Sequence, residues 1–150
     1  MTGAGVTLAV LSLVGGCLTG PAVGDRIEQP LIEEEQPDAG VTFTQLQVRV
    51  FTPSCTFSQC HAGAPPPQAP MSLEPTKAYA SLVGRASTEV SALQRVNPGQ
   101  PSASYLLFKL RGLAGTVGGV PTRMPLNKPP LSPQDLADIE AWIARGAPND

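Results

Sequence analysis

Proline and glycine interrupt this chain at short intervals, and their placement is the strongest constraint on its fold. The 150 residues include 17 prolines and 15 glycines. Proline inside a helix lacks the amide hydrogen and clashes with the preceding turn, and glycine readily adopts the conformations that end helices. Aromatic residues make up only 5% of the chain, so few large side chains are available for a core. We therefore expect a small domain of short helices joined by long loops.

Four segments between these interruptions carry apolar side chains at helical spacing. They cover residues 43–51, 76–83, 102–110 and 132–145. The expected N-caps are Thr42 or Thr44, Thr76, Ser102 and Ser132. The residues expected to stop these helices are Pro53, Gly84, Gly112 and Gly146. No segment shows the strict alternation of a strand, so the sequence predicts an all-α domain of about four short helices with long loops rich in proline and glycine.

The first 16 residues have the pattern of a signal peptide. Residues 6–14 are predominantly apolar and uncharged but too few to span a bilayer, which suits the central region of an export signal. The run Val-Gly-Gly-Cys at residues 14–17 resembles the lipobox of bacterial lipoproteins, and this resemblance implies cleavage after residue 16 and a lipid on Cys17. By the same resemblance, Leu18 in place of an acidic residue favours the outer membrane of a Gram-negative cell, although the sequence leaves the membrane open. An ordinary signal peptide with an unrelated Cys17 is the alternative.

Residues 17–40 have the composition of a flexible acidic linker. They combine proline and glycine with the cluster Glu33 to Glu35, and they show no apolar periodicity. The folded domain is then expected over residues 41–150. The chain carries a net charge of −2 and its ten Lys and Arg residues are scattered, so the basic surface of a nucleic-acid-binding protein is absent from the sequence.

Residues 55–61, Cys-Thr-Phe-Ser-Gln-Cys-His, contain the only histidine of the chain. Two cysteines followed directly by histidine are typical of covalent haem attachment, in which the sulfurs bond the vinyl groups and the histidine binds the iron. Four residues separate these cysteines in place of the usual two, so the intervening loop must bulge. The motif predicts haem c held by Cys55, Cys60 and His61.

A thioether opposite the histidine completes the iron coordination of many electron-transfer haems and raises their reduction potential. Met124 is expected to supply it, from a Met-Pro loop shortly before the last helix. Met71 is the competing sulfur, but it follows His61 so closely that its loop would have difficulty reaching the opposite haem face. The cations expected at the solvated surface, with contact to haem propionates as the alternative, are Lys109, Arg111, Arg123 and Lys128.

The order of these features resembles class I cytochromes c over about residues 43–147. The segments FTPSCTFSQCHAG, NPGQPSASYLLFKLRG and MPLNKPPLSPQDLADIEAWIARGA are also similar to the cytochrome c-like domains of bacterial lipoproteins. This resemblance implies that the first and last helices pack across each other beside the haem. It also implies electron transfer rather than catalysis. The side chains that would meet are Phe43, Leu46 and Val50 from one helix and Ile139, Trp142 and Ile143 from the other.

Other uses of the cysteines remain open at this point. In an oxidising compartment Cys55 and Cys60 can form a disulfide, which would leave His61 an ordinary surface residue and Met124 a core side chain. Two thiolates, an imidazole and a thioether also suit Cu(I), whereas zinc would lack a fourth ligand. No nucleophile lies in a recognisable catalytic turn, so hydrolytic chemistry is not expected.

The sequence thus predicts a monohaem electron carrier rather than an enzyme. It would be tethered by lipid to a membrane, on the periplasmic or cell-surface side, and would exchange electrons with a periplasmic or surface redox partner protein. The alternative is a haem-free surface lipoprotein that keeps the cytochrome-like helices, is stapled by a Cys55–Cys60 disulfide and serves as a binding module.

Overall fold

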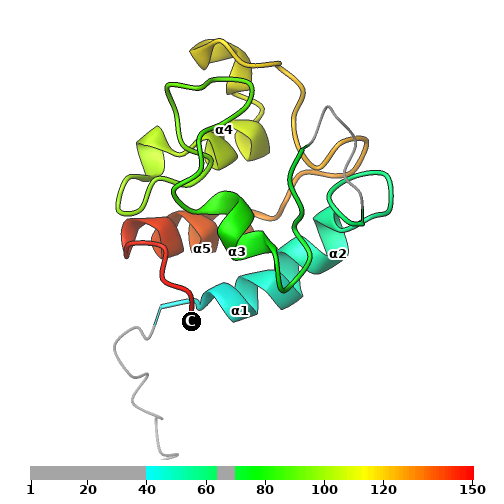
Figure 1. Ribbon diagram of the computed structural model, residues 1–150, viewed down its shortest axis with the longest axis vertical. Coiled ribbons are helices and arrows are strands. Elements are labelled where there is room, and N and C mark those ends of the chain that lie inside the picture. The colour runs from blue at the N-terminus through cyan, green and yellow to red at the C-terminus, as the bar shows by residue number, and fades with distance from the viewer. Residues whose placement is uncertain (1–39, 64–69) are drawn as a thin grey trace, which may run out of the picture. The chain divides into compact units, whose positions relative to one another are not determined.

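The described part of the chain, residues 40–63 and 70–150 of a computed structural model, is helical with long connecting loops (Figure 1). Its elements are α1 (Phe43–Leu46), the π-helical turn η1 (Gln47–Phe51), α2 (Thr52–Cys55), α3 (Ala78–Leu82), the 3-10 turn η2 (Pro101–Ala103), α4 (Tyr105–Arg111), the 3-10 turn η3 (Ala114–Val117) and α5 (Pro133–Ala144). Pairing between extended segments is limited, within these ranges, to isolated bridges such as Val83 with Val96. The prediction of a small all-α domain is confirmed.

The predictions for the N-terminal region lie outside the described residues. They are the signal peptide of residues 1–16, the lipid on Cys17 and all but the last residue of the linker over 17–40. In the residues that the structure does describe, no helix is both long enough and apolar enough to cross a membrane.

The helix over residues 43–55 begins where the sequence predicts but continues further. The Thr42 hydroxyl accepts a hydrogen bond from the amide of Gln45 at 3.1 Å, and the Gln45 side chain accepts one from the amide of Thr42 at 2.9 Å, which forms a capping box. Pro53 was expected to end this helix, and that prediction is wrong. The amide of Thr52 bonds to the carbonyl of Gln47, five residues back, and this wider π-helical turn relieves the clash that proline causes in a regular helix.

The two middle helices end as predicted but begin later. α3 starts at Ala78 without a side-chain cap, because the Glu74 carbonyl already accepts the amides of Lys77 and Ala78 at 2.9 and 2.8 Å. Thr76 is therefore not its cap. Ser102 lies within η2, and α4 begins after Ser104 instead. Gly112 ends α4 in the left-handed conformation, at a φ of 73°, which glycine adopts without strain.

The last helix matches its prediction closely. The Ser132 hydroxyl accepts a hydrogen bond from the amide of Asp135 at 3.0 Å, and Pro133 occupies the first turn. The helix runs to Ala144, and Gly146 follows with a φ of 98°. This helix is the longest in the described part and supplies much of the core.

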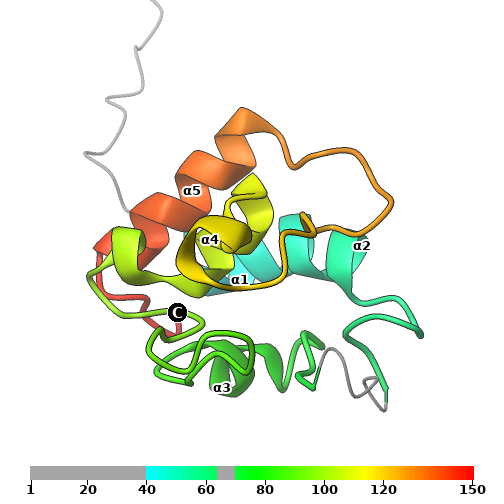
Figure 2. The ribbon, with the colours of Figure 1, turned by 90° about the horizontal axis from the view of Figure 1, so that it is seen from above.

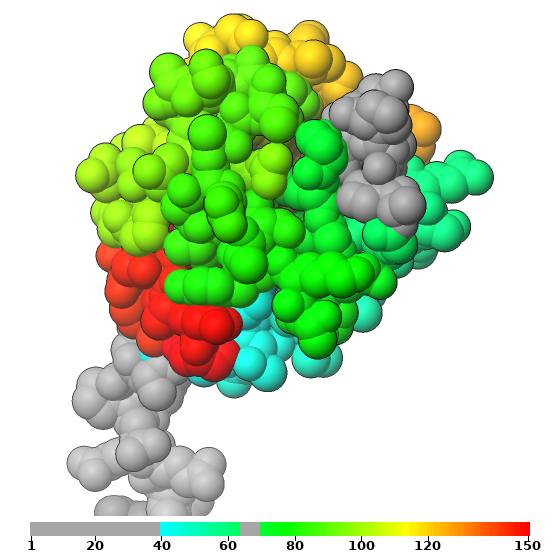
Figure 3. All heavy atoms as spheres, viewed as in Figure 1, coloured from blue at the N-terminus to red at the C-terminus, as the bar shows by residue number. Residues whose placement is uncertain are grey.

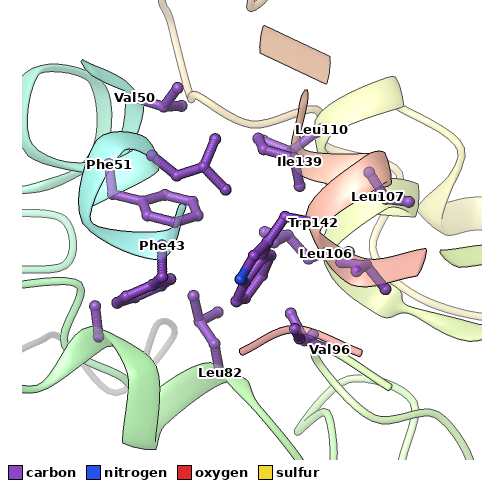
Figure 4. Close-up of a cluster of buried hydrophobic side chains, with 14 of the residues drawn as sticks. Phe43, Val50, Phe51, Leu82, Val96, Leu106, Leu107, Leu110, Ile139 and Trp142 are labelled. Atoms are coloured by element: carbon purple, nitrogen blue, oxygen red, sulfur yellow. The ribbon is translucent and has the colours of Figure 1, made fainter. Parts of the chain in front are cut away.

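The core forms where α5 meets the first helix. The rings of Phe43 and Trp142 lie 5.3 Å apart, so the predicted contact between the first and last helices is confirmed (Figure 4). Leu107 and Leu110 of α4 close this core from one side. Figure 2 shows α4 and α5 on one side of the domain and α3 with its flanking loops on the other. The remaining core includes Leu46, Val50, Phe51, Leu82, Val96, Leu106, Ile139 and Ile143.

Candidate functional site

Every residue predicted to bind haem contributes to one cavity of about 790 Å³. Cavities that hold small molecules and cofactors usually measure about 300–1,000 Å³ and are mostly apolar. The apolar lining here comes from the C-terminal part of the first helix, from the segment before α3, from α3 and α4, and from the loop before α5. It includes Val50, Phe51, Leu73, Leu82, Leu106 and Leu131. The predicted ligands in the wall are Cys55, Cys60, His61 and Met124.

The loop between the two cysteines is a closed turn. Cys55 is the last residue of α2, so the helix fixes its position. The amide of Cys60 donates to the carbonyl of Phe57 at 2.8 Å, and the amide of His61 donates to the carbonyl of Cys55 at 3.2 Å. The chain therefore returns to the same wall of the cavity despite the longer spacing.

Both cysteines are half-buried free thiols. The disulfide of the alternative hypothesis is therefore not formed in this structure. Burial raises the pKa of the Cys55 thiol to about 12, and the neighbouring Cys60 adds to the rise. An apolar environment disfavours the charged thiolate, so Cys55 is protonated at neutral pH.

The His61 imidazole is held by the backbone in one tautomer. Its Nδ1 lies 3.2 Å from the carbonyl oxygen of Met71, and because a carbonyl only accepts, Nδ1 carries the proton and Nε2 keeps its lone pair. Burial lowers the pKa of His61; the hydrogen bond to Met71 opposes this change and the charge of Arg95 adds to it. Metal-binding histidines commonly donate their second nitrogen to a carbonyl in this way.

The two candidate sulfurs belong to different parts of the cavity wall. The carbonyl of Met71 bonds to His61, so Met71 belongs to the wall that carries the histidine. The amide of Met124 donates to the carbonyl of Lys109 at 2.9 Å, which ties Met124 to the end of α4. Figure 2 shows the loop between η3 and α5 on the opposite side of the domain from the segment that leads into α3. This arrangement favours Met124 as the sulfur across from His61.

A polar region of the wall was not expected from the sequence. Lys109 is only 9% exposed, so the expectation that it is a solvated surface cation is wrong. It forms an ion pair with Glu89 at 3.2 Å and lines the cavity together with Tyr105 and Arg95. Tyr105 and Lys109 are four residues apart in α4, a spacing that places them on the same helix face and was the available signal. Glu89 and Arg95 lie in a long loop, and nothing in the local sequence marks them.

The guanidinium of Arg95 donates a hydrogen bond to the carbonyl of Ser81 at 2.8 Å. This bond fixes a half-buried cation in the segment over residues 70–100, which covers much of the face seen in Figure 3.

Arg111 pairs with Glu140 at the surface, and Lys128 is exposed with its ammonium 5.0 Å from the centre of the Phe57 ring. Of the four predicted surface cations, these two agree with the prediction.

The residues in the described ranges include no group of three or more His, Cys, Asp or Glu side chains arranged to hold a metal ion directly. Copper or zinc held by the two thiols and His61 requires such a group, so these alternatives receive no support. A haem does not require it, because the thiols bond carbon atoms of the porphyrin.

Comparison of the chain with protein-family models, with curated proteins and with solved structures found no match in any of the three. The functional argument therefore depends on the residues of the cavity and on their contacts.

Proposed function

We propose that the domain is a monohaem c-type cytochrome that carries electrons. The observation that carries this proposal is the shared cavity: Cys55, Cys60 and the only histidine, from one short stretch, line a largely apolar space of about 790 Å³ together with Met124, which is distant in the sequence. The volume and the largely apolar lining are compatible with a bound cofactor.

Each ligand residue has a role that its contacts support. The thiols of Cys55 and Cys60 would hold the haem covalently, one from the end of α2 and one from the turn that follows. His61 has its Nε2 lone pair free because Met71 occupies Nδ1, and Met124 would supply the thioether. The bound haem would supply an iron that takes up and releases one electron.

The remaining lining would keep water from the iron and balance the charge of the cofactor. Most of the lining surface is apolar, with leucine, valine and phenylalanine side chains among its contributors, so the ligands lie in a medium of low polarity. Arg95 is a fixed cation in the same wall and would face the propionates, whereas the charge of Lys109 is paired with Glu89. In this proposal the lipid on Cys17 holds the domain at a membrane, where it meets a periplasmic or surface redox partner.

The proposal is tested by absorbance of the full chain made in a host with haem-attachment machinery. We expect a Soret band and a reduced α band, and haem that stays with the chain after denaturation. Cys55→Ser/Cys60→Ser should abolish the covalent attachment. A colourless wild-type protein, in a host that loads a control cytochrome, would refute the proposal.

The distal ligand is tested separately in the ferric protein. Thioether ligation gives a weak far-red charge-transfer band, which Met124→Ala should remove and Met71→Ala should leave unchanged. The opposite pattern would transfer the axial role to Met71.

A further inference from the structure

A network of hydrogen bonds connects the polar part of the cavity wall to the segment that leads into Met124. The Glu89 carboxylate accepts hydrogen bonds from the hydroxyl of Tyr105, from the ammonium of Lys109 at 3.2 Å and from the amide of Val120 at 2.9 Å. Lys109 also donates to the carbonyl of Val120 at 3.2 Å. The Val120 residue is therefore bound at both its amide and its carbonyl, four positions before Met124.

The same lysine is connected to Met124 through its backbone. The carbonyl of Lys109 accepts the amide of Met124 at 2.9 Å, so one residue of α4 binds this segment at two places. The side chain of Lys109 is 11% exposed and that of Glu89 is 26% exposed. An ion pair that is largely removed from water and carries additional hydrogen bonds holds its geometry far better than a surface pair.

Tyr105 adds a steric constraint to the electrostatic one. A Cβ atom built on Gly119 would lie 2.0 Å from the Tyr105 hydroxyl oxygen, so the backbone at Gly119 passes directly against this hydroxyl. Tyr105 is only 5% exposed and cannot move aside without disturbing the wall. The close approach requires glycine at position 119.

The ionisation states agree with this network. Burial alone would raise the pKa of Glu89, but hydrogen bonds from Tyr105, Val120 and Lys109 outweigh burial and lower it. Burial, together with the bond to Glu89, raises the pKa of the Tyr105 phenol. Glu89 is thus an anion at neutral pH and Tyr105 a neutral donor, as the contacts require.

We propose that Glu89, Lys109 and Tyr105 form a positioning cluster that fixes the segment from η3 to Met124 and so keeps the Met124 thioether at the cavity. This inference depends on the proposed function, because it assigns these residues to holding an iron ligand. None of the three would touch the iron. Their effect is on how often the Met124 sulfur leaves it.

The test measures how fast an external ligand replaces Met124 in the ferric, haem-loaded full chain. Imidazole binds only after the thioether has left the iron, so its limiting binding rate reports the opening of the segment. A hydrogen bond to an ionised group is worth about a tenfold change in an equilibrium or more. We expect Tyr105→Phe and Glu89→Gln each to accelerate imidazole binding about tenfold and to weaken the far-red band.

Gly119→Ala tests the same contact from the other side, since it removes no polar group and acts only by displacing the segment from Tyr105. It should also accelerate imidazole binding. The matched control is Glu140→Gln, which makes the same chemical change in an exposed pair that also involves α4, between Glu140 and Arg111. It should leave the rate and the band unchanged.

The outcomes separate this inference from the proposed function. Wild-type rates in Tyr105→Phe, Glu89→Gln and Gly119→Ala, in a protein that binds haem and shows the band, would overturn the inference alone. Equal acceleration in Glu140→Gln would also overturn it, because the effect would then be general. A wild-type chain without haem would overturn the proposed function and this inference with it.

Discussion

The position of Cys55 in the cavity wall predicts that its thiol reacts slowly with disulfide reagents. Burial raises its pKa to about 12, from an ordinary value of 9.0. At pH 8 the thiolate fraction is then about one in ten thousand, compared with about one in ten for an exposed cysteine, a decrease of about a thousandfold. Since only the thiolate attacks, this difference slows the reaction of Cys55 with a disulfide reagent.

A second effect opposes the first. A thiolate of higher pKa is a better nucleophile, with a Brønsted coefficient of about 0.4–0.5, so three pKa units return a factor of about 15–30. The net decrease is about 30- to 60-fold. Restricted access of the reagent to a half-buried sulfur slows the reaction further, so this figure is a lower bound.

The assay uses haem-free protein with Cys55 as the only cysteine, in the variant Cys17→Ser/Cys60→Ser. Removing Cys60 leaves most of the pKa shift, because burial is its larger cause. The rate of reaction with an aromatic disulfide reagent is measured at pH 8 in buffer and again in denaturant. Circular dichroism checks that the variant remains helical in buffer.

We expect the folded protein to react at least about 30 times more slowly than the denatured chain. The variant Cys17→Ser/Cys55→Ser, which keeps Cys60 alone, shows whether the turn after α2 shares this protection. Equal rates for Cys55 in a folded and in a denatured chain would refute its assignment to the wall of an apolar cavity.

Three further predictions concern the haem-free fold. Burial lowers the pKa of His61, so the unfolded chain binds a proton there more readily, and the free energy of unfolding should fall as the pH drops below about 6.5. Denaturant midpoints at pH 5 and pH 7 test this. The same change of midpoint with pH in His61→Gln would contradict it. Ile139→Val should lower the free energy of unfolding by about 0.5–1.5 kcal/mol, because the side chain is fully buried in the core. Its control, Val48→Ala at a 71% exposed position, should change it by less than about 0.5 kcal/mol, and equal losses would be inconsistent with this core. Ser132→Ala should lower the free energy of unfolding in urea by about 1 kcal/mol, because the Asp135 amide loses the hydroxyl that caps α5, and an unchanged value would contradict this cap.

Local sequence signals predicted those helices whose ends depend on nearby residues. Ser132 and Thr42 cap their helices through side chains three residues away from the amides they bind, and Gly112 ends α4 with its own backbone. Thr76 was a misleading signal, because the carbonyl of Glu74 already satisfies the amides at the start of α3. A capping residue is predictable only where no backbone group competes for the same amide.

The polar part of the cavity wall was unpredictable for a different reason. Glu89 reaches Lys109 and Val120 from a loop that is distant in the sequence, and its role depends on where the fold brings these residues together. Lys109 read as an exposed cation because a lysine in an amphipathic helix usually faces water. The four proposed haem ligands could be predicted from the sequence pattern, whereas the charged residues around the cavity could be identified only from the tertiary structure.

The four residues between Cys55 and Cys60 make structural contacts of their own. The closed turn returns His61 to the end of α2, through the hydrogen bond from its amide to the carbonyl of Cys55. The spacer also projects Phe57, 42% exposed, toward Lys128, whose ammonium lies 5.0 Å from the ring centre. Lys128 follows Met124 in the chain, so this contact of about 0.5–1 kcal/mol connects the loop after α2 to the loop before α5. The spacer thus supplies a contact between two parts of the cavity wall, in addition to joining the two cysteines.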